Sequence, residues 1–197
     1  GGIAAYPAII KNNKNPRDLF LTFSHEWLHQ YLIFYPLGKS YFADTKMKEI
    51  NETLANIFSY KLLEGLCNKD FELKKEICKK TVADKSKFDY SKFMKKLRED
   101  VDVLLAEGKI IDAEKLMNEA KISLSNNGIK IRKLNQAWFA FNGTYADSPT
   151  SISNIDKELN KIIDSYDDLR SAIDDIKAIS SLDEFNNMIK DNADIKK

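Results

Sequence analysis

The sequence predicts a mainly α fold. Only 7 glycines and 4 prolines occur among 197 residues, and the residues that favour helices are abundant. Apolar residues recur at helical spacing in several segments, and residues that cap helices precede them. Because apolar residues make up 43% of the chain, a packed core can form. We therefore expect a helical core with little or no β structure.

Start and stop signals predict the first two helices. Asn15 and Pro16 provide an N-cap and a proline at the first helical position, and the helix should continue towards Pro36. Asp44 can cap a second helix, for which Gly65 is the expected stop. Since only a short connection separates them, we expect the two helices to run antiparallel.

The remaining helices are expected in three groups. Residues 88–128 predict an αα-hairpin with its turn at Gly108, and residues 131–142 predict an aromatic-rich helix. Residues 149–197 predict amphipathic helices, one of which begins at the capping box of Ser181 and Glu184.

We expect these segments to belong to one domain. Residues 1–148 would form the main region, with the metal site in 15–65, and residues 149–197 would pack on it.

Composition excludes some partners and leaves others open. The 31 basic residues balance the 30 acidic ones, so no basic excess indicates nucleic-acid binding. No apolar run approaches the roughly 18 residues of a membrane span. The chain lacks an initiator methionine, so we expect a longer protein in which any membrane tether lies outside this sequence. Compartment, oligomeric state and the redox state of Cys67 and Cys78 stay open.

The two histidines of the chain indicate a metal site. His25 and His29 are at positions i and i+4 of the first helix, so their imidazoles share a face and can bind one ion. Glu26 follows the first histidine, where its carboxylate can take a proton from a water rather than bind the metal. Apolar neighbours on the same helix predict that the site is buried: Phe23, Trp27, Leu28 and Tyr31.

Glu52 is the predicted third ligand. In antiparallel helices His29 and Glu52 lie at similar distances from the connecting turn, and are therefore level. Glu49, one turn earlier, is the alternative. Asn56, one turn after Glu52, can accept the second N–H of His25 and so orient it.

These residues resemble those of a known family. His25-Glu26-x-x-His29 followed by Asn51-Glu52-Thr53-Leu54-Ala55 is similar to the gluzincin metallopeptidases, the thermolysin-like clan. That resemblance implies zinc ligands at His25, His29 and Glu52, and a general base at Glu26. An aspartate is common in gluzincins where this chain has Asn56. The stretches HEWLHQYLIFYPLG, INETLANIF and NQAWFAFNGTYADSP also resemble an uncharacterised bacterial group of membrane-anchored zinc metallopeptidases.

The resemblance implies two further features. Relatives often use a histidine or tyrosine from a later segment to stabilise the oxyanion, and Tyr145 is the expected donor here, with Tyr60 as the alternative. Relatives also bind substrate along an edge strand, and Gly1–Ala8 is the expected edge.

The sequence therefore predicts a zinc-dependent metallopeptidase acting on peptides or proteins, with unknown substrate-binding residues. One alternative is a non-catalytic helical binding module with a vestigial metal site. Another is a di-iron carboxylate protein, which would need a second Glu-x-x-His element.

Overall fold

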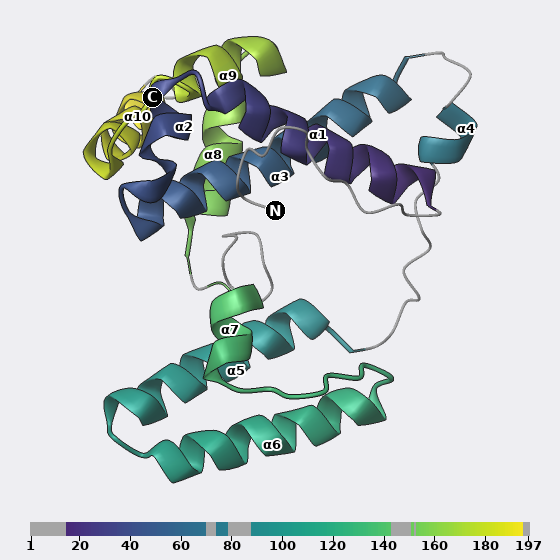
Figure 1. The fold of residues 1–197 in the computed structure, drawn as a ribbon, viewed down its shortest axis with the longest axis vertical. Coiled ribbons are helices and arrows are strands. Elements are labelled where there is room, and N and C mark those ends of the chain that lie inside the picture. The colour runs from purple at the N-terminus through teal and green to yellow at the C-terminus, as the bar shows by residue number, and fades with distance from the viewer. Residues whose placement is uncertain (1–14, 70–73, 79–87, 143–150, 152, 195–197) are drawn as a thin grey trace. The chain divides into compact units, whose positions relative to one another are not determined.

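The computed structural model describes residues 15–69, 74–78, 88–142, 151 and 153–194 (Figure 1). These residues form ten α-helices, one 3-10 helix and no strand, which confirms the mainly α prediction. The chain divides into two compact units. Residues 1–81 and 154–197 form the first, and residues 82–153 form the second. The C-terminal helices thus group with the metal-site helices, and the hairpin residues belong to a unit of their own.

Two long helices form the centre of the first unit. Helix α1 (Pro16–Leu32) begins as predicted, because the Asn15 side chain accepts a hydrogen bond from the Arg17 backbone N–H at 3.0 Å. Helix α3 (Thr45–Cys67) is capped by Asp44, also as predicted. It continues past the expected stop at Gly65, and it runs back along α1 (Figure 1).

A tight connection joins these helices at one end. It consists of α2 (Pro36–Lys39) and the 3-10 helix η1 (Ser40–Phe42). A Cβ atom on Gly38 would lie 2.0 Å from the carbonyl oxygen of Leu32, so only glycine allows the chain to pass this closely. Gly38 therefore fixes where η1 lies relative to α1.

Gly38→Ala is expected to destabilise the first unit by about 1–3 kcal/mol or more, because its backbone must move to admit the methyl group. Gly65→Ala provides a matched control, since nothing lies within 4 Å of a Cβ atom there. That control should stabilise α3 by up to ~1 kcal/mol, because alanine favours helix over glycine. Urea unfolding of both variants measures the difference, and equal midpoints would contradict the close approach.

A disulfide closes the other end of the helix pair. Cys67, the last residue of α3, is bonded to Cys78, which follows α4 (Lys74–Ile77). The Arg17 guanidinium donates a hydrogen bond to the carbonyl oxygen of Ile77 at 3.2 Å. The start of α1 and the end of α3 are therefore both attached to the α4 segment.

Removing the disulfide is expected to lower the free energy of unfolding by about 3 kcal/mol, since the bond closes an 11-residue loop. The Cys67→Ser/Cys78→Ser double variant, compared with the oxidised parent by urea unfolding, measures this cost. Reductant should lower the midpoint of the parent and leave that of the double variant unchanged. A reductant-insensitive parent would contradict the bond.

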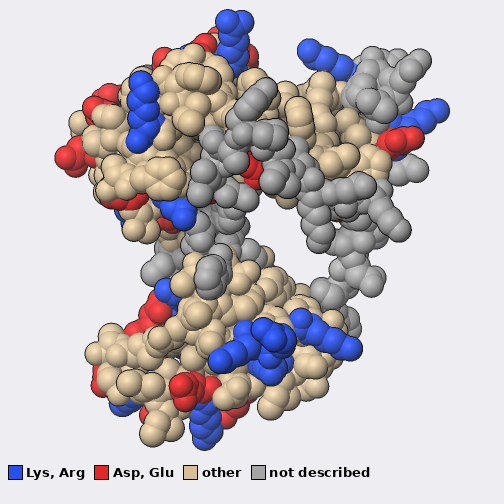
Figure 2. Space-filling view, viewed as in Figure 1, with Lys and Arg blue, Asp and Glu red and all other residues tan. Residues whose placement is uncertain are grey.

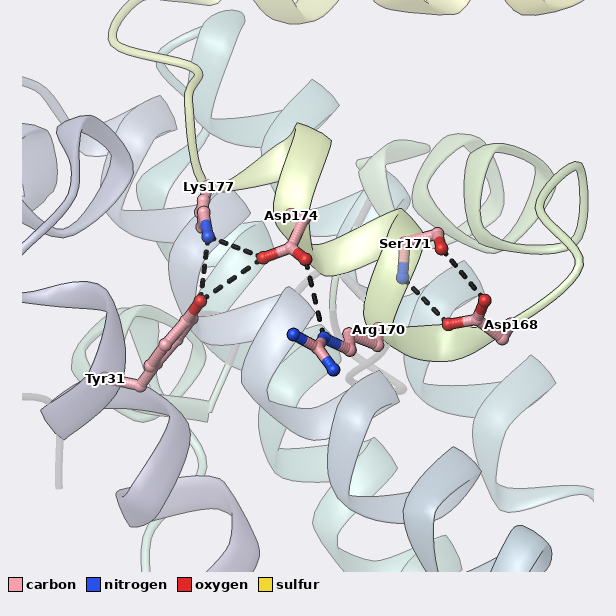
Figure 3. Close-up of polar contacts among 6 residues, drawn as sticks. All are labelled: Tyr31, Asp168, Arg170, Ser171, Asp174 and Lys177. Atoms are coloured by element: carbon pink, nitrogen blue, oxygen red, sulfur yellow. Dashed lines mark hydrogen bonds and ion pairs between the residues drawn. The ribbon is translucent and has the colours of Figure 1, made fainter.

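Three C-terminal helices complete the first unit. Helices α8 (Ile155–Ile163) and α9 (Leu169–Ile176) pack on α3, and α10 (Leu182–Asp194) packs on α8. Figure 3 shows how the end of α9 is fixed to α1. The Lys177 ammonium donates to the Tyr31 hydroxyl at 2.8 Å and also to Asp174. This contact draws the C-terminal segment against the helix that contains the two histidines.

The second unit is the predicted αα-hairpin with a short third helix. Helices α5 (Tyr90–Ala106) and α6 (Ile110–Asn126) pack together, and Gly108 adopts a positive φ of 73° at their turn. Helix α7 (Gln136–Asn142) begins later than the expected residue 131. The reason is local, because the Asn135 side chain caps it by accepting from the Trp138 backbone N–H at 2.9 Å.

Basic and acidic side chains are mixed on the surface, as their nearly equal numbers in the sequence lead one to expect. On the face drawn in Figure 2, basic side chains lie on both units with acidic side chains among them. Within the described part of the chain, no helix combines the length and the apolar character that crossing a membrane requires.

Candidate metal site

His25, His29 and Glu52 lie together between α1 and α3. The Nε2 atoms of the two histidines are 3.0 Å apart. The Oε2 atom of Glu52 is 3.5 Å from Nε2 of His25 and 3.4 Å from Nε2 of His29. All three residues are buried, and together they could bind a metal ion. Glu52, the predicted third ligand, therefore lies level with the two histidines.

The spacing of these atoms fits a tetrahedral ion. Ligand bonds of about 2.0–2.1 Å in tetrahedral geometry place neighbouring ligand atoms about 3.3 Å apart. The three observed separations, 3.0, 3.4 and 3.5 Å, bracket that value. Three protein ligands leave a fourth position for water or substrate.

The local charge also favours a cation. Oε2 of Glu52 is buried and has no hydrogen-bond partner among the residues that the structure describes. Its separations of 3.4 and 3.5 Å from the two imidazole nitrogens are too long for good hydrogen bonds. Burial raises the pKa of Glu52, yet the two imidazoles and the Tyr41 hydroxyl outweigh it and hold the pKa well below its usual range. A buried carboxylate with an unpaired oxygen is costly, and a bound cation would offset that cost.

Asn51 orients the second histidine. The Asn51 amide nitrogen donates to the carbonyl oxygen of Leu37 at 3.2 Å, so its oxygen is the acceptor for Nδ1–H of His29 at 2.8 Å. With the proton on Nδ1, the lone pair of Nε2 points towards Glu52 and is available to a metal. Tyr41 acts on the other side of the site, where its hydroxyl donates to Oε1 of Glu52.

Comparisons with family models, with curated proteins and with solved structures gave no match to this chain. The similarity to gluzincins therefore depends on the residues of the site, and membership of that family stays a prediction. The capacity to bind a metal depends only on the geometry described above.

The burial of the site has a different origin from the one expected. The site is buried as predicted, but two of the apolar neighbours on which that prediction depends, Phe23 and Trp27, are 54% and 48% exposed. They lie on another face of α1, because residues at i+2 on a helix point about 200° away. Packing of α1 against α3, with Leu28 and Leu32 fully buried, is what encloses His25 and His29.

Other predicted residues are placed as follows. Glu49, the alternative ligand, is paired with the Lys46 ammonium at 2.7 Å and is not in the cluster. Glu26 follows His25 on α1 and is half-buried, and its role as a base stays a prediction. Asn56 is half-buried on α3, and its support of His25 also stays a prediction. Tyr60, the alternative oxyanion donor, is on the outer part of α3 and 55% exposed.

Two expectations fall on residues outside the described part of the chain. These are the oxyanion donor Tyr145 and the substrate-binding edge Gly1–Ala8.

Asn51 and Tyr41, which contact the ligands, were not among the predicted site residues. Asn51 had a usable signal, because it precedes the predicted ligand Glu52 on the same helix. Tyr41 had none, since its position depends on how the connection between α1 and α3 folds.

Proposed function

We propose that this chain is a zinc-dependent metallohydrolase that cleaves peptide bonds. The observation that supports the proposal most strongly is the burial of the Glu52 carboxylate beside the two histidines. Its Oε2 faces two imidazole nitrogens at ligand spacing, and no described residue satisfies it by a hydrogen bond. A glutamate, Glu26, follows the first of those histidines on the same helix.

The donor set supports zinc over magnesium and calcium. Two imidazole nitrogens and one carboxylate oxygen suit zinc, whereas magnesium and calcium prefer oxygen ligands alone. Two histidines with one glutamate also form a known catalytic zinc set, which leaves one coordination position open. A di-iron centre is disfavoured because both histidines of the chain belong to this one cluster.

Each residue has a distinct part in the proposed reaction. A bound zinc ion would supply Lewis acidity, polarising a carbonyl group and making water more acidic. Glu26 takes the proton from the attacking water and passes it to the leaving amine. Asn51 holds His29 in the tautomer that presents Nε2. Tyr145 is proposed to donate to the oxyanion that forms during attack.

Two measurements test the proposal together. Elemental analysis of the purified chain should find one zinc ion per chain, and a quenched peptide library should be hydrolysed in a chelator-sensitive way. Zinc without hydrolysis would favour the alternative of a non-catalytic helical module with a vestigial metal site. Absence of any bound metal, even after incubation with zinc, would refute the proposal.

A further inference from the structure

The two oxygens of the Glu52 carboxylate have different surroundings. Oε1 accepts a hydrogen bond from the Tyr41 hydroxyl. Oε2 accepts none from the described residues and faces Nε2 of both histidines at 3.4 and 3.5 Å. The carboxylate is therefore held in one orientation, with a single oxygen directed at the candidate metal position.

The fold holds Tyr41 in place independently of that hydrogen bond. Tyr41 belongs to η1 and is 7% exposed. Its ring makes a T-shaped contact with His29, with centroids 6.2 Å apart and planes at 87°, and the Lys48 ammonium lies 5.7 Å from the ring centroid. The hydroxyl is thus presented to Glu52 by a buried ring that has contacts of its own with His29 and Lys48.

The same connection also supports Asn51. The carbonyl oxygen of Leu37 accepts from the Asn51 amide at 3.2 Å and from the Ser40 hydroxyl at 3.2 Å. The segment between α1 and α3 therefore supports two of the candidate ligands. It supports His29 through Asn51, and it supports Glu52 through Tyr41. The segment therefore helps to orient the side chains of His29 and Glu52.

A carboxylate can bind a metal through one oxygen or through two. Two-oxygen binding would occupy an additional coordination position, and a catalytic zinc site needs one position open for water or substrate. The Tyr41 hydroxyl would have to give up its charge-assisted hydrogen bond before Oε1 could turn towards the ion. The hydroxyl therefore opposes two-oxygen binding.

We propose that Tyr41 is a positioning residue that restricts Glu52 to one-oxygen coordination and so keeps a coordination position open at the metal. This inference rests on the proposed metal site of His25, His29 and Glu52. It gives Tyr41 no direct part in the chemistry, because its hydroxyl acts through the carboxylate.

Cobalt(II) substitution tests the inference, because its visible absorption weakens as its coordination number rises. Tyr41→Phe keeps the ring contacts and removes only the hydroxyl. Tyr166→Phe is the matched control, since it removes a tyrosine-to-carboxylate bond, to Asp175 at 2.8 Å, outside the cluster. We expect all three proteins to bind one cobalt ion per chain. Only Tyr41→Phe should show weaker absorption, together with metal affinity about 10–100-fold lower, as is usual for loss of an outer contact.

The possible results separate two failures. If the parent binds cobalt and Tyr41→Phe has the same spectrum and affinity, the inference is wrong while the metal site stands. If the parent binds no metal, the site and the inference fail together.

A crystal structure of the zinc-loaded parent gives a second measurement that does not depend on the folding of a variant. Oε2 at about 2.0–2.2 Å from zinc, with Oε1 still on Tyr41, supports the inference. Both oxygens bound to zinc would overturn it.

Discussion

Glu26→Gln is expected to retain zinc and lose peptide hydrolysis by about 10²–10⁴-fold, the usual contribution of a positioned general base. The amide has nearly the same shape as the carboxylate, but it cannot accept the proton of the attacking water. Glu26 lies beside His25 on α1 and is absent from the ligand cluster, so zinc content should not change. Turnover at saturating peptide and elemental analysis measure the two effects separately.

Glu64→Gln is the control for that experiment. Glu64 is an exposed glutamate near the C-terminal end of α3, and its replacement should leave both turnover and zinc content unaltered. Turnover of Glu26→Gln within about tenfold of the parent would place the base elsewhere. Loss of zinc from Glu26→Gln would instead indicate that Glu26 helps to form the metal site.

Local signals in the sequence were sufficient for the main helices and for the metal cluster. Asn15 and Asp44 cap α1 and α3 where expected, because an N-cap is decided by one side chain and the next few backbone amides. His25 and His29 share a face because helical periodicity requires it. The prediction of Glu52 as the third ligand needed one further assumption, which is that two helices joined by a short connection run antiparallel.

Features that depend on tertiary packing were not predictable. The position of Tyr41 depends on the close approach of Gly38 to Leu32, and nothing in the local sequence specifies that contact. The exposure of Trp27 was also not predicted. An apolar residue beside the motif need not face the core. Likewise, the sequence does not indicate that the hairpin forms its own unit.

Glu52→Gln is expected to lose most of the stabilisation that zinc gives to the parent protein, because Glu52 is the proposed third ligand. Without metal, the parent keeps a buried carboxylate whose Oε2 has no hydrogen-bond partner in the described structure. The variant removes that charge and can still accept the Tyr41 hydroxyl through its amide oxygen. The variant should therefore keep the fold of the metal-free parent but lack the carboxylate that would bind the metal.

Zinc should stabilise the parent much more than the variant. At a zinc concentration about 1,000 times the parent's dissociation constant, binding adds about 4.1 kcal/mol to the free energy of unfolding. A variant that binds about 100-fold more weakly would gain only about 1.4 kcal/mol under the same conditions. Urea unfolding with and without zinc measures both gains. Glu49→Gln is the control, because Glu49 is paired with Lys46 and lies outside the cluster, and it should show the full gain of the parent. A full gain in Glu52→Gln, or its loss in Glu49→Gln, would show that Glu52 is not the third ligand.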